Sequence, residues 1–419
     1  MKNNVIEVRL WDKTVGLLMW DERKGSSVFQ FDKNFKKYNL DISPVAAPFD
    51  SVFVQKGFPM SGNSERLYGG LPEFIADSLP DRWGNEVFQK WMKVHYRHNR
   101  QITAVDRLSF IGKRAMGALE FYPAHVEEDA SVDIELESLY DLANKIFNER
   151  QNVSIDLGSG LVIEDLYKVG TSAGGQRPKA IIAINETSGV VRSGQAILPP
   201  EFKHYILKFD TGKPGDFPFT KVEMAYYLMA RDAGIDMMPS KLVEINGTQN
   251  FLTERFDRVG GKKLHTQTLA AMSSLVDSYD DLFTVGRRIG LSAEDQQQQY
   301  SRMVFNVLAK NIDDHTKNFS FVMTPDGVWH LSPAYDLIFS VDPDVRFFRN
   351  HELSLGGKRK NIARDDMIAL AERQNVKDAA DVIDRISDVV SNFRRYAQMT
   401  GISDCWAKKI DNVLCEGLI

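Results

Sequence analysis

The segment NIDDHTKNFSFVMTPDGVWHLSPAYD, residues 311–336, places three polar side chains of one chemical kind close together along the chain. The preceding residues, 294–310, carry apolar side chains at helical spacing, which predicts a buried helix. Asp313 is therefore expected in the loop that directly follows this helix.

The second half of the segment predicts a β-hairpin. Residues 319–323 and 328–331 are short apolar runs on either side of the turn sequence TPDG, a pattern typical of paired strands. Because a hairpin returns its end to its start, Asn318 and Asp336 should meet at the open end. Asp313 should lie a few residues away.

Carboxylate and amide oxygens are the ligands that Mg²⁺ prefers. The same set suits phosphoryl transfer, in which an Asp accepts the hydroxyl proton and an Asn five residues later holds metal. A second Asp beyond a hairpin would bridge the metal to the phosphates of a nucleotide. The structural alternative is that Asp313 and Asp314 end a helix and Asp336 is a turn residue.

Length and composition are those of a globular protein. The chain has 419 residues, enough for two or three domains, with 43% hydrophobic and 26% charged residues. The net charge of −5 gives no basic excess that would indicate nucleic acid as the main ligand. The sequence shows neither a signal peptide nor an apolar run of the ~18 residues that span a membrane. We expect a cytoplasmic protein in which Cys405 and Cys415 are free thiols.

The periodicity predicts an α+β, two-lobed organisation with nucleotide in the cleft between the lobes. Residues 4–30 alternate as strands do, 132–150 form an amphipathic helix, and 151–175 form a loop rich in small and polar residues. Strand signals return from Lys179 onwards. After Phe256 the pattern is almost wholly helical apart from the hairpin, with one long amphipathic helix over 378–399. The expected divisions are 1–150, an N-terminal subdomain; 151–258, a β-rich nucleotide lobe; and 259–419, a helical lobe.

The loop GTSAGGQRPK, residues 170–179, is the second informative stretch. Gly174 and Gly175 can adopt positive φ and form an anion-binding nest, so the loop could close over phosphates. Its spacing matches neither the P-loop nor the dinucleotide fingerprint. The alternative is a plain flexible loop.

Two strands offer further nucleotide contacts. Lys208 in YILKF would either face solvent or point into a cleft, where it would contact α- and β-phosphates. The strand FLTERFD, residues 251–257, could offer its backbone to an adenine edge, with Glu254 and Phe256 lining the base pocket. A simple strand end is the alternative.

These stretches, taken together, resemble the HipA family of bacterial serine/threonine kinases, the toxins of HipBA-type toxin–antitoxin pairs. The resemblance covers nearly the whole chain. It rests on stretches in a characteristic order and spacing: LPEFIADSLPDRWG (71–84), RAMGALEFY (114–122), GTSAGGQRPK, YILKFD, LTERFDR, NIDDHTKNFS and LSPAYDL.

The resemblance implies a protein-kinase-like or phosphoinositide-kinase-like fold with an extra N-terminal subdomain on the β-rich lobe and an all-helical C-terminal lobe. It implies Asp313 as the catalytic base, and Asn318 and Asp336 as ligands of Mg²⁺. It also implies a set of ATP contacts: Lys208 at the phosphates, Glu254 and Phe256 at adenine, Tyr335 near the base, Gln267 at the ribose or base, and Ala173, Gly174, Gly175 and Lys179 in the covering loop.

In this family the glycine-rich loop carries a self-phosphorylated Ser, which ejects the loop and silences the kinase. The matching position here is Thr171, with Ser172 beside it. Either residue could be modified, or the switch could be lost. A phosphate there would add a charge of about −2 and compete with bound nucleotide.

The resemblance further implies a HipB-like DNA-binding antitoxin, with DNA contacted only through that partner, and a protein substrate such as an aminoacyl-tRNA synthetase. Two alternatives belong to other classes. One is a catalytically weak subunit that binds the antitoxin in transcriptional autoregulation, and the other is a small-molecule or lipid kinase.

Overall fold

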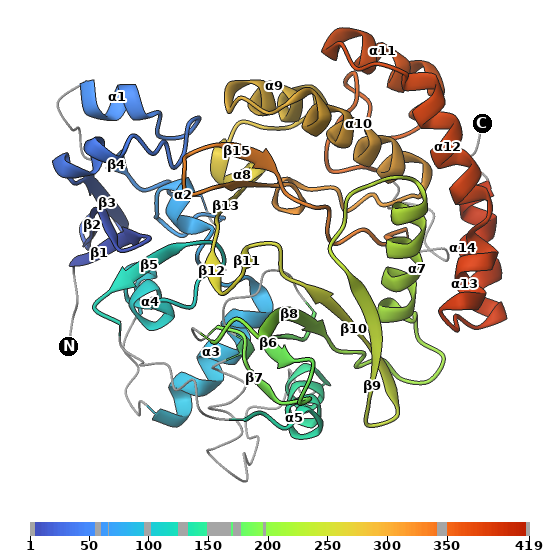
Figure 1. Ribbon diagram of the computed structural model, residues 1–419, viewed down its shortest axis with the longest axis horizontal. Coiled ribbons are helices and arrows are strands. Elements are labelled where there is room, and N and C mark those ends of the chain that lie inside the picture. Colours follow the sequence, from blue (N-terminus) through green and yellow to red (C-terminus); the bar gives the residue numbers. More distant parts are fainter. Residues whose placement is uncertain are drawn as a thin grey trace. The chain divides into compact units, whose positions relative to one another are not determined.

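The computed structural model describes residues 5–54, 60–65, 67–95, 102–124, 133–148, 169–170, 177–195, 198–341 and 350–415 (Figure 1). The chain forms two compact units. The first comprises Met1–Thr211, Val243–Gln267 and Met323–Val328, and the second comprises Gly212–Leu242, Thr268–Val322 and Trp329–Ile419.

The first unit opens with an antiparallel five-stranded sheet in the order β4-β3-β2-β1-β5. Its strands are β1 (Val5–Leu10), β2 (Lys13–Asp21), β3 (Ser26–Phe31), β4 (Met60–Ser61) and β5 (Leu119–Tyr122). Ile6, Val8 and Leu10 are buried at every second position of β1, as expected for a strand with one face in a core. The predicted β-rich start is confirmed.

Helices follow in the first unit, among them the amphipathic helix predicted within residues 132–150. They are the 3₁₀ helix η1 (Lys33–Tyr38), α1 (Phe49–Val54), α2 (Glu73–Ala76), α3 (Arg82–His95), α4 (Ala104–Ile111) and α5 (Leu136–Asn148). Thr103 starts α4 with a capping box, in which its hydroxyl accepts from Asp106 N and the Asp106 carboxylate accepts from Thr103 N.

The second sheet has the order β7-β6-β8-β10-β9. Its strands are β6 (Lys179–Asn185), β7 (Val191–Ser193), β8 (Phe202–Lys208), β9 (Ser240–Ile245) and β10 (Thr248–Glu254). Helices α3 and α5 lie beside it (Figure 1). One buried cluster joins α3, α5 and the sheet, with Trp83, Trp91, Ile146, Ile182 and Leu207 among its members. The expected boundary at 151–175 falls mostly outside the described residues.

Three short strands follow β10, where the sequence pattern predicted helix. They are β11 (Arg258–Val259), β12 (Lys262–Lys263) and β13 (His265–Thr268). The prediction is wrong here because these strands are short and mostly polar. They give no apolar alternation from which a strand could be recognised.

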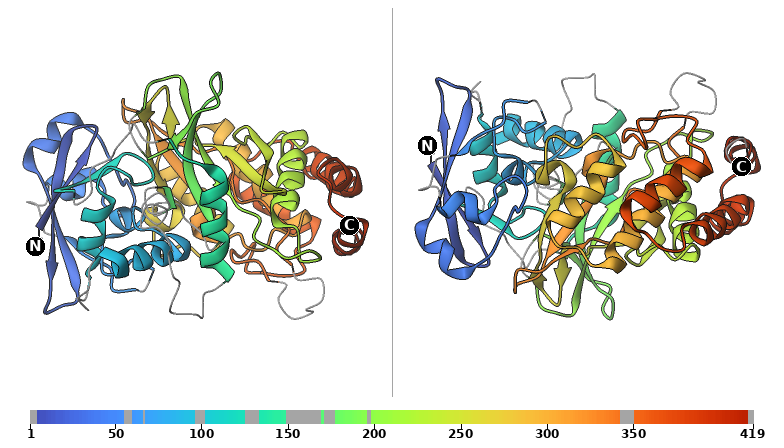
Figure 2. Two further views of the ribbon diagram at one scale, coloured as in Figure 1. Left: turned by 90° about the horizontal axis from the view of Figure 1, so that it is seen from below. Right: turned by 90° about the horizontal axis from the view of Figure 1, so that it is seen from above.

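The second unit is mainly helical, as predicted. It contains α7 (Phe219–Asp232), α8 (Leu269–Met272), α9 (Tyr279–Arg288), α10 (Ala293–Leu308), the 3₁₀ helix η2 (Thr316–Asn318), most of the hairpin β14 (Ser320–Met323) and β15 (Trp329–Leu331), α11 (Arg364–Gln374), α12 (Ala379–Ser391), α13 (Phe393–Met399) and α14 (Asp404–Cys415). The predicted apolar stripe of α10 is buried, with Met303 and Val304 at its centre. Helix α14 lies beside both α12 and α13, which follow each other along the chain (Figure 2).

The single helix expected over 378–399 is divided at Asn392. The Asn392 side chain donates to Asp388 O at 2.7 Å, and its backbone N–H donates to Val389 O at 3.2 Å. An Asn side chain that competes for backbone groups favours a helix end over a continuous helix. The apolar periodicity continues across the break, so the sequence pattern alone does not reveal it.

Cys405 and Cys415 are exposed free thiols, as expected. Within the described ranges, no helix is both long and apolar enough to cross a bilayer.

Candidate active site

The loop after α10 is fixed by backbone and side-chain contacts on both sides of Asp313. Asn311 N donates to Asn306 O at 3.0 Å, which closes the C-terminus of the helix. Ile312 N and Asp313 N both donate to Ser340 Oγ, at 2.7 and 3.1 Å. The Asp313 side chain remains 63% exposed. The loop therefore presents this carboxylate on a fixed backbone.

Asn318 lies against the same loop, as the sequence predicted. Its side-chain Nδ2 donates to Asp313 O at 2.8 Å. The amide NH₂ is thus used within the loop, which makes the amide oxygen the ligand atom that this side chain can offer to a cation. The bond also sets the distance between the Asp313 backbone and the Asn318 side chain.

The predicted hairpin is present and returns the chain to Asn318. Ser332 N donates to Ser320 O at 3.0 Å across its open end. The Tyr335 hydroxyl contacts Ser320 Oγ and donates to Lys317 O at 2.7 Å. The residue before Asp336 is therefore bonded to the residue before Asn318. The structure thus brings the Asn318 and Asp336 segments together, and it uses the Tyr335 hydroxyl to do so.

Asp336 adopts a left-handed backbone conformation, with φ of 55°. The strand leading to it is anchored by the buried Arg302, whose Nη2 donates to Ser332 O. Burial lowers the pKa of Arg302 to about 10. Ala334 N donates to Asp236 O at 2.8 Å and secures the same stretch. The stretch that leads into the turn at Asp336 is thus secured at two points.

Asp314, the neighbour of Asp313, has the opposite environment. Its side chain is fully buried and accepts from Glu352 N at 2.7 Å and from the Tyr279 hydroxyl. His351 Nδ1 lies 2.8 Å from the same carboxylate. Burial, followed by the Asp314 charge, raises the pKa of Tyr279 well above its ordinary value, so the phenol stays a donor. Sequence reasoning favoured Asp314 as a helix-end residue and did not predict this role.

The donor set of the hairpin has the chemistry of a magnesium site. An amide oxygen from Asn318 and a carboxylate from Asp336 are hard oxygen ligands, which suits a cation that keeps several waters and binds substrate phosphates. Across the described residues, no group of three or more His, Cys, Asp or Glu side chains is arranged to hold a metal by itself. The arrangement fits a shared site, to which a phosphorylated substrate would add ligands.

The remaining predicted residues belong to the first unit. Lys179 and Lys208 are directly opposite in the β6–β8 pair, and Phe251 is opposite Lys208 on the other side. Lys208 Nζ is 5.9 Å from the centre of the Phe251 ring. Residues directly opposite each other on adjacent strands point to the same face of the sheet, so the two lysines share one face.

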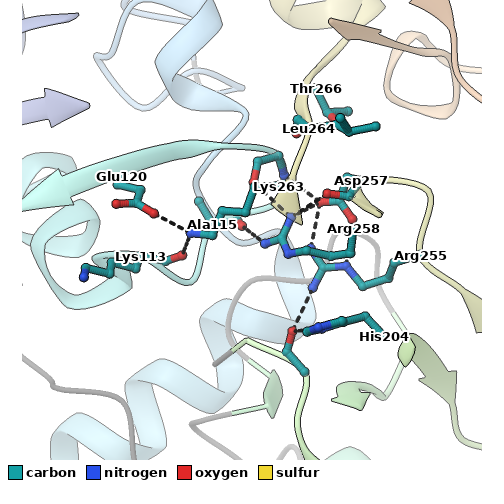
Figure 3. Close-up of polar contacts among 12 residues, drawn as sticks. Lys113, Ala115, Glu120, His204, Arg255, Asp257, Arg258, Lys263, Leu264 and Thr266 are labelled. Carbon is teal, nitrogen blue, oxygen red and sulfur yellow. Dashed lines mark hydrogen bonds and ion pairs between the residues drawn. The ribbon is translucent and has the colours of Figure 1, made fainter. Parts of the chain in front are cut away.

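Glu254 and Phe256 are partly exposed. Arg255, which lies between them, and Asp257, which follows Phe256, are buried. The buried side chains form the polar network of Figure 3, which the sequence analysis did not find. Its only signal in the sequence is the density of charge in TERFDR at the end of an apolar strand.

Gln267 is fully buried, and within the described part of the chain neither polar atom of its amide has a hydrogen-bond partner. Such a group is unusual in a folded protein and suits a site for water or a polar ligand. The loop residues Thr171, Ser172, Ala173, Gly174 and Gly175 lie outside the described residues.

Comparison with known proteins agrees with this organisation. A solved HipA toxin from Shewanella oneidensis, determined with HipB and its operator DNA, matches 99% of this chain and 96% of its own at a TM-score of 0.63 and 16% identity. At that identity the match shows the fold alone. It is a mixed fold, β-rich in the N-terminal region and helical in the C-terminal region.

The family follows from the sequence models. The HipA-like C-terminal domain matches residues 171–395, more than half of the chain, and the HipA N-terminal domain matches residues 6–122. The chain belongs to the HipA family.

Two curated relatives are provisionally named kinases. Y4dM of Sinorhizobium fredii is 27% identical over 192 residues, which are 41% of this chain and 46% of the relative. A Haemophilus influenzae protein is 26% identical over 218 residues, 46% of this chain and 60% of the relative. The chain thus spans about half the length of the curated relatives that it matches.

Proposed function

We propose that this protein is an ATP- and Mg²⁺-dependent serine/threonine protein kinase and the toxin of a toxin–antitoxin pair. One observation carries the proposal. The Asn318 amide is bonded to the Asp313 backbone, and Tyr335 is bonded to Lys317, so the loop Asp and the Asn lie beside the segment that carries the second Asp, at the open end of one hairpin. A scaffold that only binds a partner has no need of this set.

In the proposed reaction Asp313 accepts the proton of the substrate hydroxyl as that oxygen attacks the terminal phosphorus of ATP, and the bond from this phosphorus to the bridging oxygen breaks to release ADP. Its high exposure leaves it open to a protein side chain. The Asn318 oxygen and the Asp336 carboxylate would hold Mg²⁺, which supplies charge neutralisation at the phosphates when it is bound. The Ser340 contacts keep Asp313 in place while the proton moves.

The first unit would hold the nucleotide. Lys208 and Lys179 would contact phosphate oxygens, an assignment supported by their opposed positions on β8 and β6. Glu254 and Phe256 would frame adenine, and Gln267 would contact the ribose or base. Tyr335 would pack near the base through its ring while its hydroxyl stays on the hairpin. Ala173, Gly174 and Gly175 would cover the phosphates.

The proposal includes self-phosphorylation at Thr171 or Ser172 and a protein substrate of the translation machinery, such as an aminoacyl-tRNA synthetase. It also includes a small DNA-binding antitoxin as partner. The fold shared with a HipA that was determined together with HipB and operator DNA supports this partner. The same observation favours a second candidate function, an antitoxin-binding subunit in transcriptional autoregulation with weak catalysis.

The test separates the two functions by turnover. Purified protein is incubated with Mg-ATP, with and without a candidate antitoxin, and ADP formation is measured beside Asp313→Ala. The kinase proposal expects ADP formation that the substitution abolishes and the antitoxin suppresses. Equal, negligible turnover in both proteins, together with tight antitoxin binding, would overturn it in favour of the regulatory subunit.

A further inference from the structure

Two stretches about 140 residues apart in the sequence meet around the carboxylate of Asp257 (Figure 3). Residues 114–122 come from the N-terminal domain, and 252–258 run from β10 into β11. Gly117 N donates to Asp257 Oδ2 at 2.7 Å. Arg258 donates in return to Gly117 O and Ala115 O, each at 3.1 Å. The junction is therefore made by hydrogen bonds in both directions.

The junction is built from buried charge. Arg255 contacts Asp257 through both Nε and Nη2, at 2.8 and 2.7 Å, and Arg258 Nη1 lies 2.8 Å from the same carboxylate. Burial raises the pKa of Asp257, but the two guanidinium groups outweigh burial and hold it far below its ordinary value. A buried charge of this kind tolerates little displacement, because loss of one partner leaves another uncompensated.

A second ion pair joins the segment after β10 to the N-terminal domain, a few residues beyond Asp257. Lys263 Nζ lies 2.8 Å from Glu120 Oε1 and also donates to Lys113 O. Trp11 Nε1 donates to Lys263 O at 2.8 Å. The segment after β10 is thus held to the N-terminal domain at two separate points.

The other side of this segment carries the proposed adenine contacts. Arg255 and Asp257 point into the buried network (Figure 3), whereas Glu254 and Phe256 are partly exposed. Strand β10 ends at Glu254, and Phe256 and Asp257 are neighbours in the turn that follows it. Anchoring Asp257 therefore fixes the backbone from which Glu254 and Phe256 project.

We propose that residues 113–120 of the N-terminal domain position the Glu254–Phe256 segment through Asp257, so that the N-terminal domain sets nucleotide affinity. Asp257 is a positioning residue in this account and touches no nucleotide itself. The inference rests on the proposed function for its ligand. The positioning itself can be measured without one.

The test uses two glycines of the N-terminal domain that share a left-handed conformation. A Cβ on Gly117, at φ of 73°, would lie 3.0 Å from Thr266 N, which is closer than backbone can accommodate without moving. A Cβ on Gly25, at φ of 63°, would meet nothing within 4 Å. Gly25→Ala therefore introduces the same kind of backbone strain as Gly117→Ala. It does not displace any neighbouring residue, whereas Gly117→Ala pushes against Thr266 beside the junction.

Amide hydrogen exchange of a peptide covering 251–258, and the Kd for Mg-ATP, are measured on both variants. Gly117→Ala should speed exchange in that peptide and raise the Kd about tenfold, whereas Gly25→Ala should change neither. Turnover at saturating ATP should stay close to wild type, because the catalytic loop belongs to the other unit. Equal exchange and equal Kd in the two variants would overturn the proposal.

A second pair covers the case in which Gly117→Ala does not fold. Lys263→Met removes the ion pair with Glu120, and Lys262→Met changes its exposed neighbour on the same strand. Only Lys263→Met should loosen 251–258 and raise the Kd. If wild type binds no ATP, the proposed function fails. In that case the rate of amide hydrogen exchange in the peptide covering 251–258 still tests whether the N-terminal domain positions this segment. Equal rates in Lys263→Met and Lys262→Met would contradict that role.

Discussion

The His351 imidazole lies 2.8 Å from the buried carboxylate of Asp314, one residue after the proposed catalytic Asp313. Asp314 also receives the Tyr279 hydroxyl and Glu352 N, and Asn306 donates to the Tyr279 oxygen at 3.1 Å. Two adjacent aspartates thus have separate tasks. The exposed one is open to solvent, and the buried one ties the loop to the residues around it.

Asp314→Asn should lower turnover more than it lowers nucleotide affinity. The amide keeps the shape of the side chain but turns one acceptor oxygen into a donor, which would face the groups that now donate to Asp314. We expect a loss of unfolding free energy of roughly 1–3 kcal/mol and a fall in kcat with a nearly unchanged Kd for Mg-ATP. Kinetics and denaturant melts measure both. The control is Asp384→Asn, in an exposed pair with Arg364; equal effects in the two variants would contradict a special role for Asp314.

Asp313→Ala should abolish phosphoryl transfer and leave the fold intact. The side chain is 63% exposed, so its removal should change the unfolding free energy by no more than about 0.5 kcal/mol. Loss of a general base should reduce turnover by a factor of about 10² or more. Steady-state ADP formation and a thermal melt check both statements. Substantial residual turnover would remove Asp313 from this role.

Asp336 can be tested with two substitutions that differ in backbone tolerance. Asn accepts the left-handed conformation found here, whereas Ala does so at a cost. Asp336→Asn should therefore keep near-wild-type stability, and both variants should lose Mg²⁺-dependent nucleotide affinity because the anionic ligand is gone. Titration of ATP with and without Mg²⁺ measures this. Unchanged Mg²⁺ dependence in Asp336→Asn would exclude Asp336 from the metal site.

Acid should destabilise the first unit before its carboxylates titrate. Burial lowers the pKa of His204 and of His265 to about 4, against about 6.5 in an unfolded chain. Both histidines are neutral when folded, so the unfolded state takes up more protons below pH 6.5. Stability should be complete above about pH 6.5 and fall as the pH drops towards 4. Thermal melts should show a weaker fall in His265→Gln, and no change from wild type in the exposed His330→Gln. Identical slopes in all three proteins would refute this origin.

Local patterns in the sequence were enough to predict the hairpin over residues 319–331. Asn318 and Asp336 are brought together by a turn and two short strands, and the helix before Asp313 has a clear apolar stripe. The networks around Asp314 and Asp257 could not be predicted in this way. They join residues 37 and 140 positions apart, and pairings over such distances leave no periodic signal. Charge inside an apolar stretch, as in TERFDR, marks a buried network but not its partners.

The sequence analysis did not predict the short strands after Phe256 or the helix break at Asn392, for a related reason. The local structure at both places is determined by a few backbone hydrogen bonds rather than by burial of an apolar face. Asn392 ends a helix within a continuous apolar pattern, and β11 to β13 have almost no apolar pattern. The fold class and the family resemblance did not depend on these details, and both are confirmed.

Intact-mass spectrometry after incubation with Mg-ATP, with wild type beside Asp313→Ala, tests the kinase assignment most directly. A kinase that modifies its own loop should gain one phosphate in the wild type only, mapped to Thr171 or Ser172, and should form ADP. Equal masses before and after incubation, with no more ADP than the Asp313→Ala protein produces, would contradict the kinase assignment.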